Sequence, residues 1–216
     1  DGTELTGTGW ALQNPKDYID VLKYIIPEAV AQSGVSSKDI IGIGLDFTSC
    51  TMLPVDENNV PLCLLVKNVS RPHAWVKLWK HHGAQKQADE INELLKKRGE
   101  IDNIQFGGKI SSELLLPKIL QIVEEDPELY DEAASFLEVG DWLTQILTNG
   151  RKRSGNLAGY KAMWTPETGY PSKDFLLQLS PKLENLTEDK LGDDITLAGQ
   201  PVGYLTEDWA KELGLC

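Results

Sequence analysis

The sequence has few basic residues and no long apolar run, and each shortage excludes a class of protein. Its 21 Lys and Arg stand against 33 Asp and Glu, which gives a net charge of -12. A nucleic-acid partner is not expected, because binding to phosphates requires a surplus of Lys and Arg. No apolar run approaches the roughly 20 residues that cross a bilayer, and residues 1–9 lack the basic and apolar parts of a signal peptide. We therefore expect a cytoplasmic protein with no membrane partner.

Cysteine and histidine are also scarce. Cys50, Cys63 and Cys216 are widely spaced and include no CxxC pair, so we interpret them as reduced structural thiols. All three histidines lie within residues 72–82, where the pattern predicts a helix. Metal-binding histidines on a helix usually stand four residues apart, and these do not. We predict no metal site in this chain, and a helix at 72–82 that packs through its two tryptophans.

The chain has enough apolar residues for one substantial core, since 41% of its 216 residues are hydrophobic. Helical and strand patterns alternate along it, which is typical of the α/β class. Capping residues support several helix ends, for example Asn14 before Pro15 and Gly34 after the same helix. The predicted helices cover 15–33, 72–82, 84–98, 112–125, 142–147, 173–179 and 207–213, and the predicted strands cover 40–45, 52–55, 61–66 and 136–139.

The sequence also predicts how the strands at 40–45, 52–55 and 61–66 are placed in the fold. Residues 40–45 form a short apolar run without polar alternation, which indicates a strand covered on both faces. Residues 52–55 and 61–66 flank the polar stretch 56–59, so they indicate a hairpin. A proline in each arm favours edge strands.

A carboxylate and three hydroxyls follow the predicted strand 40–45 directly, in the sequence LDFTSCT of residues 45–51. Ligands of open α/β sheets collect at this end of the strands. Asp46, Thr48 and Ser49 offer both the acceptors and the donors that a polyol needs. The alternative is that these side chains only satisfy the backbone of their own turn.

Two further polar positions are candidates for the same site. Lys161 lies between small residues and aromatics in the sequence AGYKAMW, so it could reach a sugar hydroxyl or a phosphoryl group as a point charge. The alternative is an ordinary solvated lysine. Glu113 follows the serines of the segment 107–113, where it could face a pocket or simply interact with a helix N-terminus.

Several blocks taken together resemble the FGGY family of carbohydrate kinases, and in particular its members that act on L-ribulose. The blocks occur in the order of the family and extend over nearly the whole chain: 42–56, 72–82, 107–113, 158–164, 169–172 and 181–185.

The resemblance implies an actin-like, ribonuclease-H-like α/β fold with two domains and ATP-dependent phosphorylation. The substrate would be L-ribulose, converted to L-ribulose 5-phosphate in L-arabinose catabolism, with ATP and Mg²⁺ as cofactors and a homodimer of the full-length protein as the assembly. The positions that match the sugar contacts of the family are Ser49 and Lys161, with Thr48, Asp46 and Glu113 as weaker candidates. Other members have alanine at the position of Ser49, so a backbone contact is retained there.

The same resemblance predicts that residues 1–216 are part of the first, sugar-binding domain, incomplete at both ends. The phosphate-binding turn would precede residue 1. The general-base aspartate would follow Cys216, together with the ATP-binding domain. We therefore predict no catalytic and no cofactor-binding residue in this chain, and no turnover by it alone. A kinase for D-ribulose or xylulose, and a sugar-binding or regulatory module without catalysis, remain as alternatives.

Overall fold

The structure is a computed structural model that describes residues 9–101 and 107–216. Its main sheet has four antiparallel strands in the order β1-β3-β2-β4. These are β1 (Leu12–Gln13), β2 (Met52–Val55), β3 (Val76–Lys77) and β4 (Ser135–Glu138). A small parallel sheet pairs β5 (Arg153–Ser154) with β6 (Ile195–Thr196).

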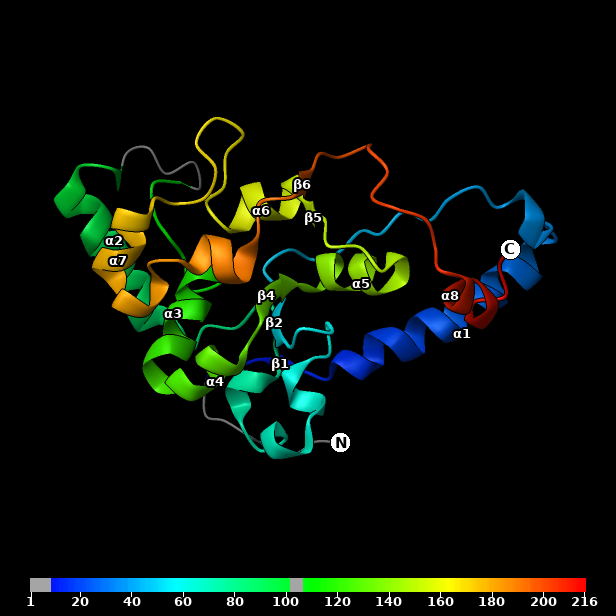
Figure 1. The fold of residues 1–216 in the computed structure, drawn as a ribbon, viewed down its shortest axis with the longest axis horizontal. Coiled ribbons are helices and arrows are strands. Elements are labelled where there is room, and N and C mark those ends of the chain that lie inside the picture. The colour runs from blue at the N-terminus through cyan, green and yellow to red at the C-terminus, as the bar shows by residue number, and fades with distance from the viewer. Residues whose placement is uncertain (1–8, 102–106) are drawn as a thin grey trace.

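Helices surround the main sheet (Figure 1). The α-helices are α1 (Pro15–Ser33), α2 (Gln85–Arg98), α3 (Leu115–Glu125), α4 (Pro127–Glu132), α5 (Val139–Thr148), α6 (Gly155–Lys161), α7 (Lys173–Leu179) and α8 (Glu207–Glu212). Short 3-10 turns occur at Ser37–Asp39, Leu62–Leu64, Val66–Asn68, Pro72–Ala74 and Pro181–Leu183, and a π-helical turn at Thr187–Leu191.

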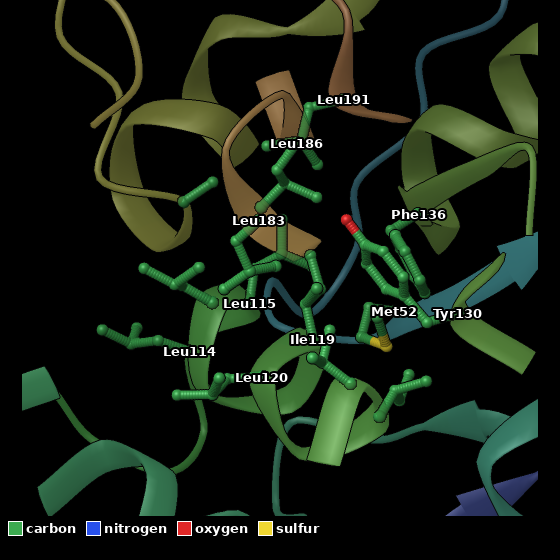
Figure 2. Close-up of a cluster of buried hydrophobic side chains, with 14 of the residues drawn as sticks. Met52, Leu114, Leu115, Ile119, Leu120, Tyr130, Phe136, Leu183, Leu186 and Leu191 are labelled. Carbon is green, nitrogen blue, oxygen red and sulfur yellow. The ribbon is translucent and has the colours of Figure 1, made fainter. Parts of the chain in front are cut away.

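Strand β2 separates two hydrophobic clusters. Side chains of a strand alternate between its faces, and Met52 accordingly joins the larger cluster while Leu53 and Val55 join the smaller one. The larger cluster gathers around α3, where Ile119 lies among leucines of the 183–191 region and Tyr130 stacks on Phe136 (Figure 2). The smaller cluster is covered by α1 and α5.

The predicted ends of several helices are confirmed. The Asn14 side chain accepts a hydrogen bond from the Lys16 amide at 3.0 Å, and Gly34 ends α1 in the left-handed conformation. Gly99 ends α2 in the same way, and the Thr206 hydroxyl caps α8. Helix α7 has the predicted bounds, whereas α3 begins at Leu115, three residues later than predicted.

The predicted strand at 40–45 is wrong. These residues are extended without strand pairing, and the Ile41 side chain is fully exposed. Within the described residues, the backbone of 41–49 makes no hydrogen bond to another backbone group. An apolar run becomes a strand only where a neighbouring strand accepts its hydrogen bonds, and no described strand lies beside this one.

The predicted hairpin is half correct. The turn after β2 is present, with the Asp56 amide donating to the Val60 carbonyl at 2.9 Å. Its second arm is not a strand, because only Pro61 bridges to Val55 before two 3-10 turns follow. Strand β2 is not an edge strand either. It tolerates Pro54 because it pairs with β3 only through Met52, so the missing proline amide interrupts no bond to β3.

The predicted helix at 72–82 is also wrong. A 3-10 turn at Pro72–Ala74 leads into strand β3, which pairs with both β1 and β2. The two tryptophans therefore share no helical face, and the Trp75 indole instead donates to the Val69 carbonyl at 3.0 Å. Short segments with β-branched residues adopt the strand conformation when partners lie on both sides.

Helices α1 and α8 form an arm that projects from the rest of the chain (Figure 1). The ammonium of Lys23 pairs with Glu212 at 2.8 Å and lies 5.6 Å from the centre of the Trp209 ring. Residues 34–46 and 197–205 connect this arm to the sheets (Figure 1). Among the described helices, none is long and apolar enough to cross a membrane.

Candidate functional site

The loop at 46–51 lies where the extended segment meets the main sheet. Its Phe47 side chain anchors it, since the ring lies 6.0 Å from that of Tyr18 and packs against the backbone of Gly140. Asp46 and Thr48, on either side of Phe47, are exposed, and Ser49 is half-buried. Within the described residues, the side chains of 46, 48 and 49 make no hydrogen bond to their own turn.

Cys50 is the most constrained residue of this loop. It is a buried non-glycine residue with a φ of 70°, a conformation that costs an L-residue roughly 1–2 kcal/mol. Its amide donates to the Glu138 Oε1 atom at 3.1 Å, and its carbonyl accepts from the Lys118 Nζ atom at 2.5 Å. Both backbone groups are therefore held by buried charged side chains, one from β4 and one from α3.

Lys118 joins the loop to a second segment. The same Nζ atom donates to the Leu78 carbonyl at 2.8 Å, next to Trp79, whose side chain is half-exposed. Burial lowers the pKa of Lys118 and raises the pKa of Glu138, because each loses its contact with water. The two groups also attract one another, which opposes both shifts.

Lys161 reaches the same loop from the last residue of α6. The Ser154 side chain caps this helix by accepting from the Leu157 amide. The Lys161 ammonium lies close enough to the Cys50 thiol for its charge to lower the pKa of that thiol, and it lies 4.4 Å from the centre of the Tyr160 ring. Burial raises the pKa of Cys50 to about 11, and the positive charges of Lys118 and Lys161 act against that rise. The structure thus brings together two segments that are more than 100 residues apart in sequence.

Glu113 lies at the approach to α3. Its carboxylate is 3.8 Å from the His82 Nε2 atom, and its charge raises the pKa of Lys118 against the larger effect of burial. The His82 ring also lies 3.3 Å from the Ser112 hydroxyl. Glu113 therefore lies beside His82 and within electrostatic reach of Lys118, the residue that holds the Cys50 carbonyl.

The sequence that forms this α/β fold, with its constrained loop and the lysine near it, matches a known family of proteins. The model of the N-terminal domain of the FGGY family of carbohydrate kinases matches residues 3–163, which is most of the chain. The chain belongs to the FGGY family of carbohydrate kinases.

The FGGY relatives extend well beyond this chain. It is 52% identical over 206 residues to a ribulokinase from Bacillus licheniformis, covering 95% of this chain and 37% of that protein. It is 48% identical over 209 residues to a ribulokinase from Halalkalibacterium halodurans, covering 97% of this chain and again 37% of that protein. The chain thus spans little more than a third of the length of these relatives.

Solved FGGY kinases share the fold at low sequence identity. A gluconate kinase from Lactobacillus acidophilus matches with a TM-score of 0.73 and 16% identity, over 98% of this chain and 38% of that one. A glycerol kinase from Plasmodium falciparum, solved with ADP, matches with a TM-score of 0.68 and 16% identity, over 97% of this chain and 40% of that one. The predicted actin-like first-domain fold is confirmed.

Sequence reasoning on this FGGY chain missed three residues of the loop's support. Cys50 was interpreted only as a structural thiol. Lys118 was placed in the predicted helix 112–125 and Glu138 in the predicted strand 136–139, neither with a role in the site. A signal for Lys118 was present: it is a single charge within the apolar run LLPKILQIV, all of which the structure buries. Such a charge needs buried partners, and a partner search from that position leads to the loop.

The histidines of this FGGY chain hold a different cluster. His73 and His81 are buried with Lys77, and the Trp10 ring lies edge-on to both at 4.9 Å. Burial lowers the pKa of each of these histidines to about 3, so both are neutral near pH 7. Within residues 9–101 and 107–216, no three His, Cys, Asp or Glu side chains gather where they could hold a metal ion.

Proposed function

We propose that this chain is the sugar-binding part of a kinase that transfers a phosphoryl group from ATP to the terminal hydroxyl of L-ribulose, giving L-ribulose 5-phosphate for L-arabinose catabolism. Two ribulokinases of about 50% identity support the substrate. FGGY kinases use ATP as the phosphoryl donor, and the glycerol kinase with ADP supports the same nucleotide here. We assign residues 1–216 to the first domain and the ATP-binding domain to the rest of the protein.

One observation carries the proposed site: Lys161 lies close enough to Cys50, the neighbour of Ser49, for its charge to act on the Cys50 thiol. A ketopentose presents hydroxyls and a carbonyl within a few ångströms of one another, so it requires donors and acceptors that converge. In this proposal Lys161 donates to a sugar oxygen, and the backbone of Ser49 fixes the orientation of the chain of hydroxyls. Asp46, Thr48 and Glu113 are accessory candidates at the rim.

The residues of this chain orient the sugar and shield it, rather than move the phosphoryl group. Phosphoryl transfer also needs charge stabilisation and an acceptor for the hydroxyl proton. The described residues do not fit a Mg²⁺ ion, because they include no cluster of carboxylates or other ligands of that kind. In our proposal the Mg²⁺ site and the general base therefore belong to other parts of the kinase.

We further place this kinase in the cytoplasm, as a homodimer of the complete protein with neither a nucleic-acid nor a membrane partner. The net charge of -12 supports a small-molecule partner over nucleic acid. Light scattering on the complete protein measures the assembly directly.

The assay that tests the function uses the complete protein with ATP and a panel of L-ribulose, D-ribulose, xylulose and glycerol, following release of ADP. We expect kcat/KM to be highest for L-ribulose. Lys161→Met should lower it on the order of 10- to 100-fold, which is the effect of losing one charged hydrogen bond. Lys16→Met is the matched control, since Lys16 is exposed on α1.

The same assay also tests the alternative functions, a kinase for another pentulose and a non-catalytic sugar-binding module. A higher kcat/KM for D-ribulose or xylulose identifies a kinase for that pentulose. Binding of a sugar without ADP release identifies a non-catalytic sugar-binding module. Equal kcat/KM in Lys161→Met and in the wild type would show that Lys161 does not contact the sugar.

A further inference from the structure

We propose that Lys118 and Glu138 together are a positioning device for the sugar site: they hold Cys50 in its left-handed backbone conformation and so orient Ser49 toward the sugar beside Lys161. The inference rests on the proposed function, because it assigns a purpose to the loop that the sugar is proposed to contact. Neither residue touches the sugar in this arrangement. Each acts through the backbone of Cys50.

The conformation of Cys50 needs external support. A non-glycine residue with a φ of 70° persists only where its surroundings hold it, and such residues are concentrated at functional sites. Cys50 sits in a turn that follows a segment without strand pairing, so local secondary structure does not supply that support. The support must come from side chains packed around it.

Lys118 and Glu138 supply it from opposite directions. Glu138 accepts from the Cys50 amide at 3.1 Å. Lys118 donates to the Cys50 carbonyl at 2.5 Å and to the Leu78 carbonyl at 2.8 Å. Three backbone groups of two separate segments are thus fixed by one lysine and one glutamate. The turn cannot rotate its peptide groups without breaking these bonds.

Stability alone does not account for this pair. The Lys118 side chain has no exposed surface and Glu138 has 3%. Taking two charges out of water costs several kcal/mol for each ion, and well-packed apolar residues in their place are often neutral or stabilising. The pair therefore contributes geometry: it fixes the amide and the carbonyl of Cys50 at a place where the charge of Lys161 acts on the Cys50 thiol.

The complete kinase with the substitution Lys118→Met tests the device. Methionine keeps most of the apolar stem but removes both hydrogen bonds. We expect the KM for L-ribulose to rise on the order of tenfold or more, because small displacements at a binding site are costly, while the KM for ATP stays within about twofold. Lys77→Met is the matched control, since Lys77 is equally buried but contacts His73 and Trp10 instead. It should leave both KM values unchanged.

A second pair of variants covers the case in which Lys118→Met does not fold. Glu138→Gln keeps an oxygen that can accept from the Cys50 amide, whereas Glu138→Leu removes it. We expect a KM for L-ribulose within about threefold of the wild type for Glu138→Gln, and a rise of about tenfold for Glu138→Leu. Equal KM values in folded Glu138→Leu and Glu138→Gln would overturn the device, as would an unchanged KM in folded Lys118→Met.

A readout without substrate separates this inference from the proposed function. The rate at which the Cys50 amide exchanges its hydrogen with solvent, measured by mass spectrometry of short peptides, should rise in Lys118→Met and not in Lys77→Met, because the released turn frees this amide from Glu138. An unchanged rate in Lys118→Met overturns the device even if the enzyme is active. A wild type that phosphorylates no ketopentose overturns the proposed function, and with it the role assigned to the turn, even if the exchange rate rises in Lys118→Met.

Discussion

Lys77 and Lys118 are both completely buried, but their ammonium groups contact different kinds of partner. Lys118 bonds to two backbone carbonyls at the proposed site. Lys77 instead lies 3.1 Å from the His73 Nδ1 atom and 4.6 Å from the centre of the Trp10 ring. Burial lowers the pKa of Lys77 to about 7, and the charge of Lys118 lowers it further, while Glu125 and Asp126 act in the opposite direction. Lys77 is therefore expected to titrate near neutral pH.

The pKa of Lys77 predicts a pH dependence of stability. Its pKa is about 7 in the folded state and 10.5 when unperturbed, so the unfolded chain binds more protons between these values. The free energy of unfolding should therefore rise with pH across this window and fall as the pH drops toward 7. Lys77→Met should remove that part of the slope. Urea denaturation of both proteins at several pH values measures it, and parallel curves would contradict the prediction.

At the residue scale, sequence reasoning placed Ser49 and Lys161 at a common site because the resemblance to a family marked both positions. It could not find Cys50, Lys118 or Glu138. A backbone torsion of 70° has no sequence signal when the residue is a cysteine rather than a glycine. The partners of a buried charge are set by the tertiary fold, so Lys118 in an apolar run indicates only that partners exist.

At the element scale, helices were predicted better than strands because their ends depend on local chemistry. Asn14, Gly34 and Thr206 act as caps within their own helices, so the signals are read directly from the sequence. Strands depend on partners that are distant in sequence. Residues 40–45 have the composition of a strand but no described partner, while β3 has an ambiguous composition but a partner on each side.

The end of α5 gives a prediction at this scale. Asn149 ends the helix with a φ of 54°, and its amide donates to the Gln145 carbonyl. Asparagine tolerates the left-handed conformation better than other non-glycine residues. Asn149→Ala should therefore lower the free energy of unfolding by about 1 kcal/mol, whereas Asn149→Gly should change it by less than about 0.5 kcal/mol. Thermal or urea denaturation distinguishes the two, and equal losses would show that the torsion is not the cause.

At the scale of the whole molecule, the chain exposes more surface than a compact protein of its mass. Its accessible surface is 11600 Å² at 24.0 kDa, whereas roughly 9,900 Å² is expected for a folded monomer of this mass. The arm of α1 and α8 and its two connecting segments extend away from the sheets (Figure 1). Several of their apolar side chains are exposed, including Tyr24, Ile41 and Tyr204.

The extended segment and the packed cores are expected to differ in local stability. The backbone of 41–49 lacks backbone partners among the described residues, whereas β2, β4 and α3 lie in the cores. Amide hydrogen exchange of the chain should therefore be fast at 41–49 and slowest at β2, β4 and α3. Mass spectrometry of peptides after exchange measures this. Equal protection of the two regions would contradict the prediction.

Strand β2 has a consequence for how this protein can change. Met52 and Leu53 are joined by one peptide bond, yet each belongs to a different cluster. A substitution that shifts the strand to suit one cluster shifts it in the other as well, so variants in the two cores should show epistasis rather than additive effects. Directed evolution of either core alone would then select compensating changes on the opposite side of the sheet.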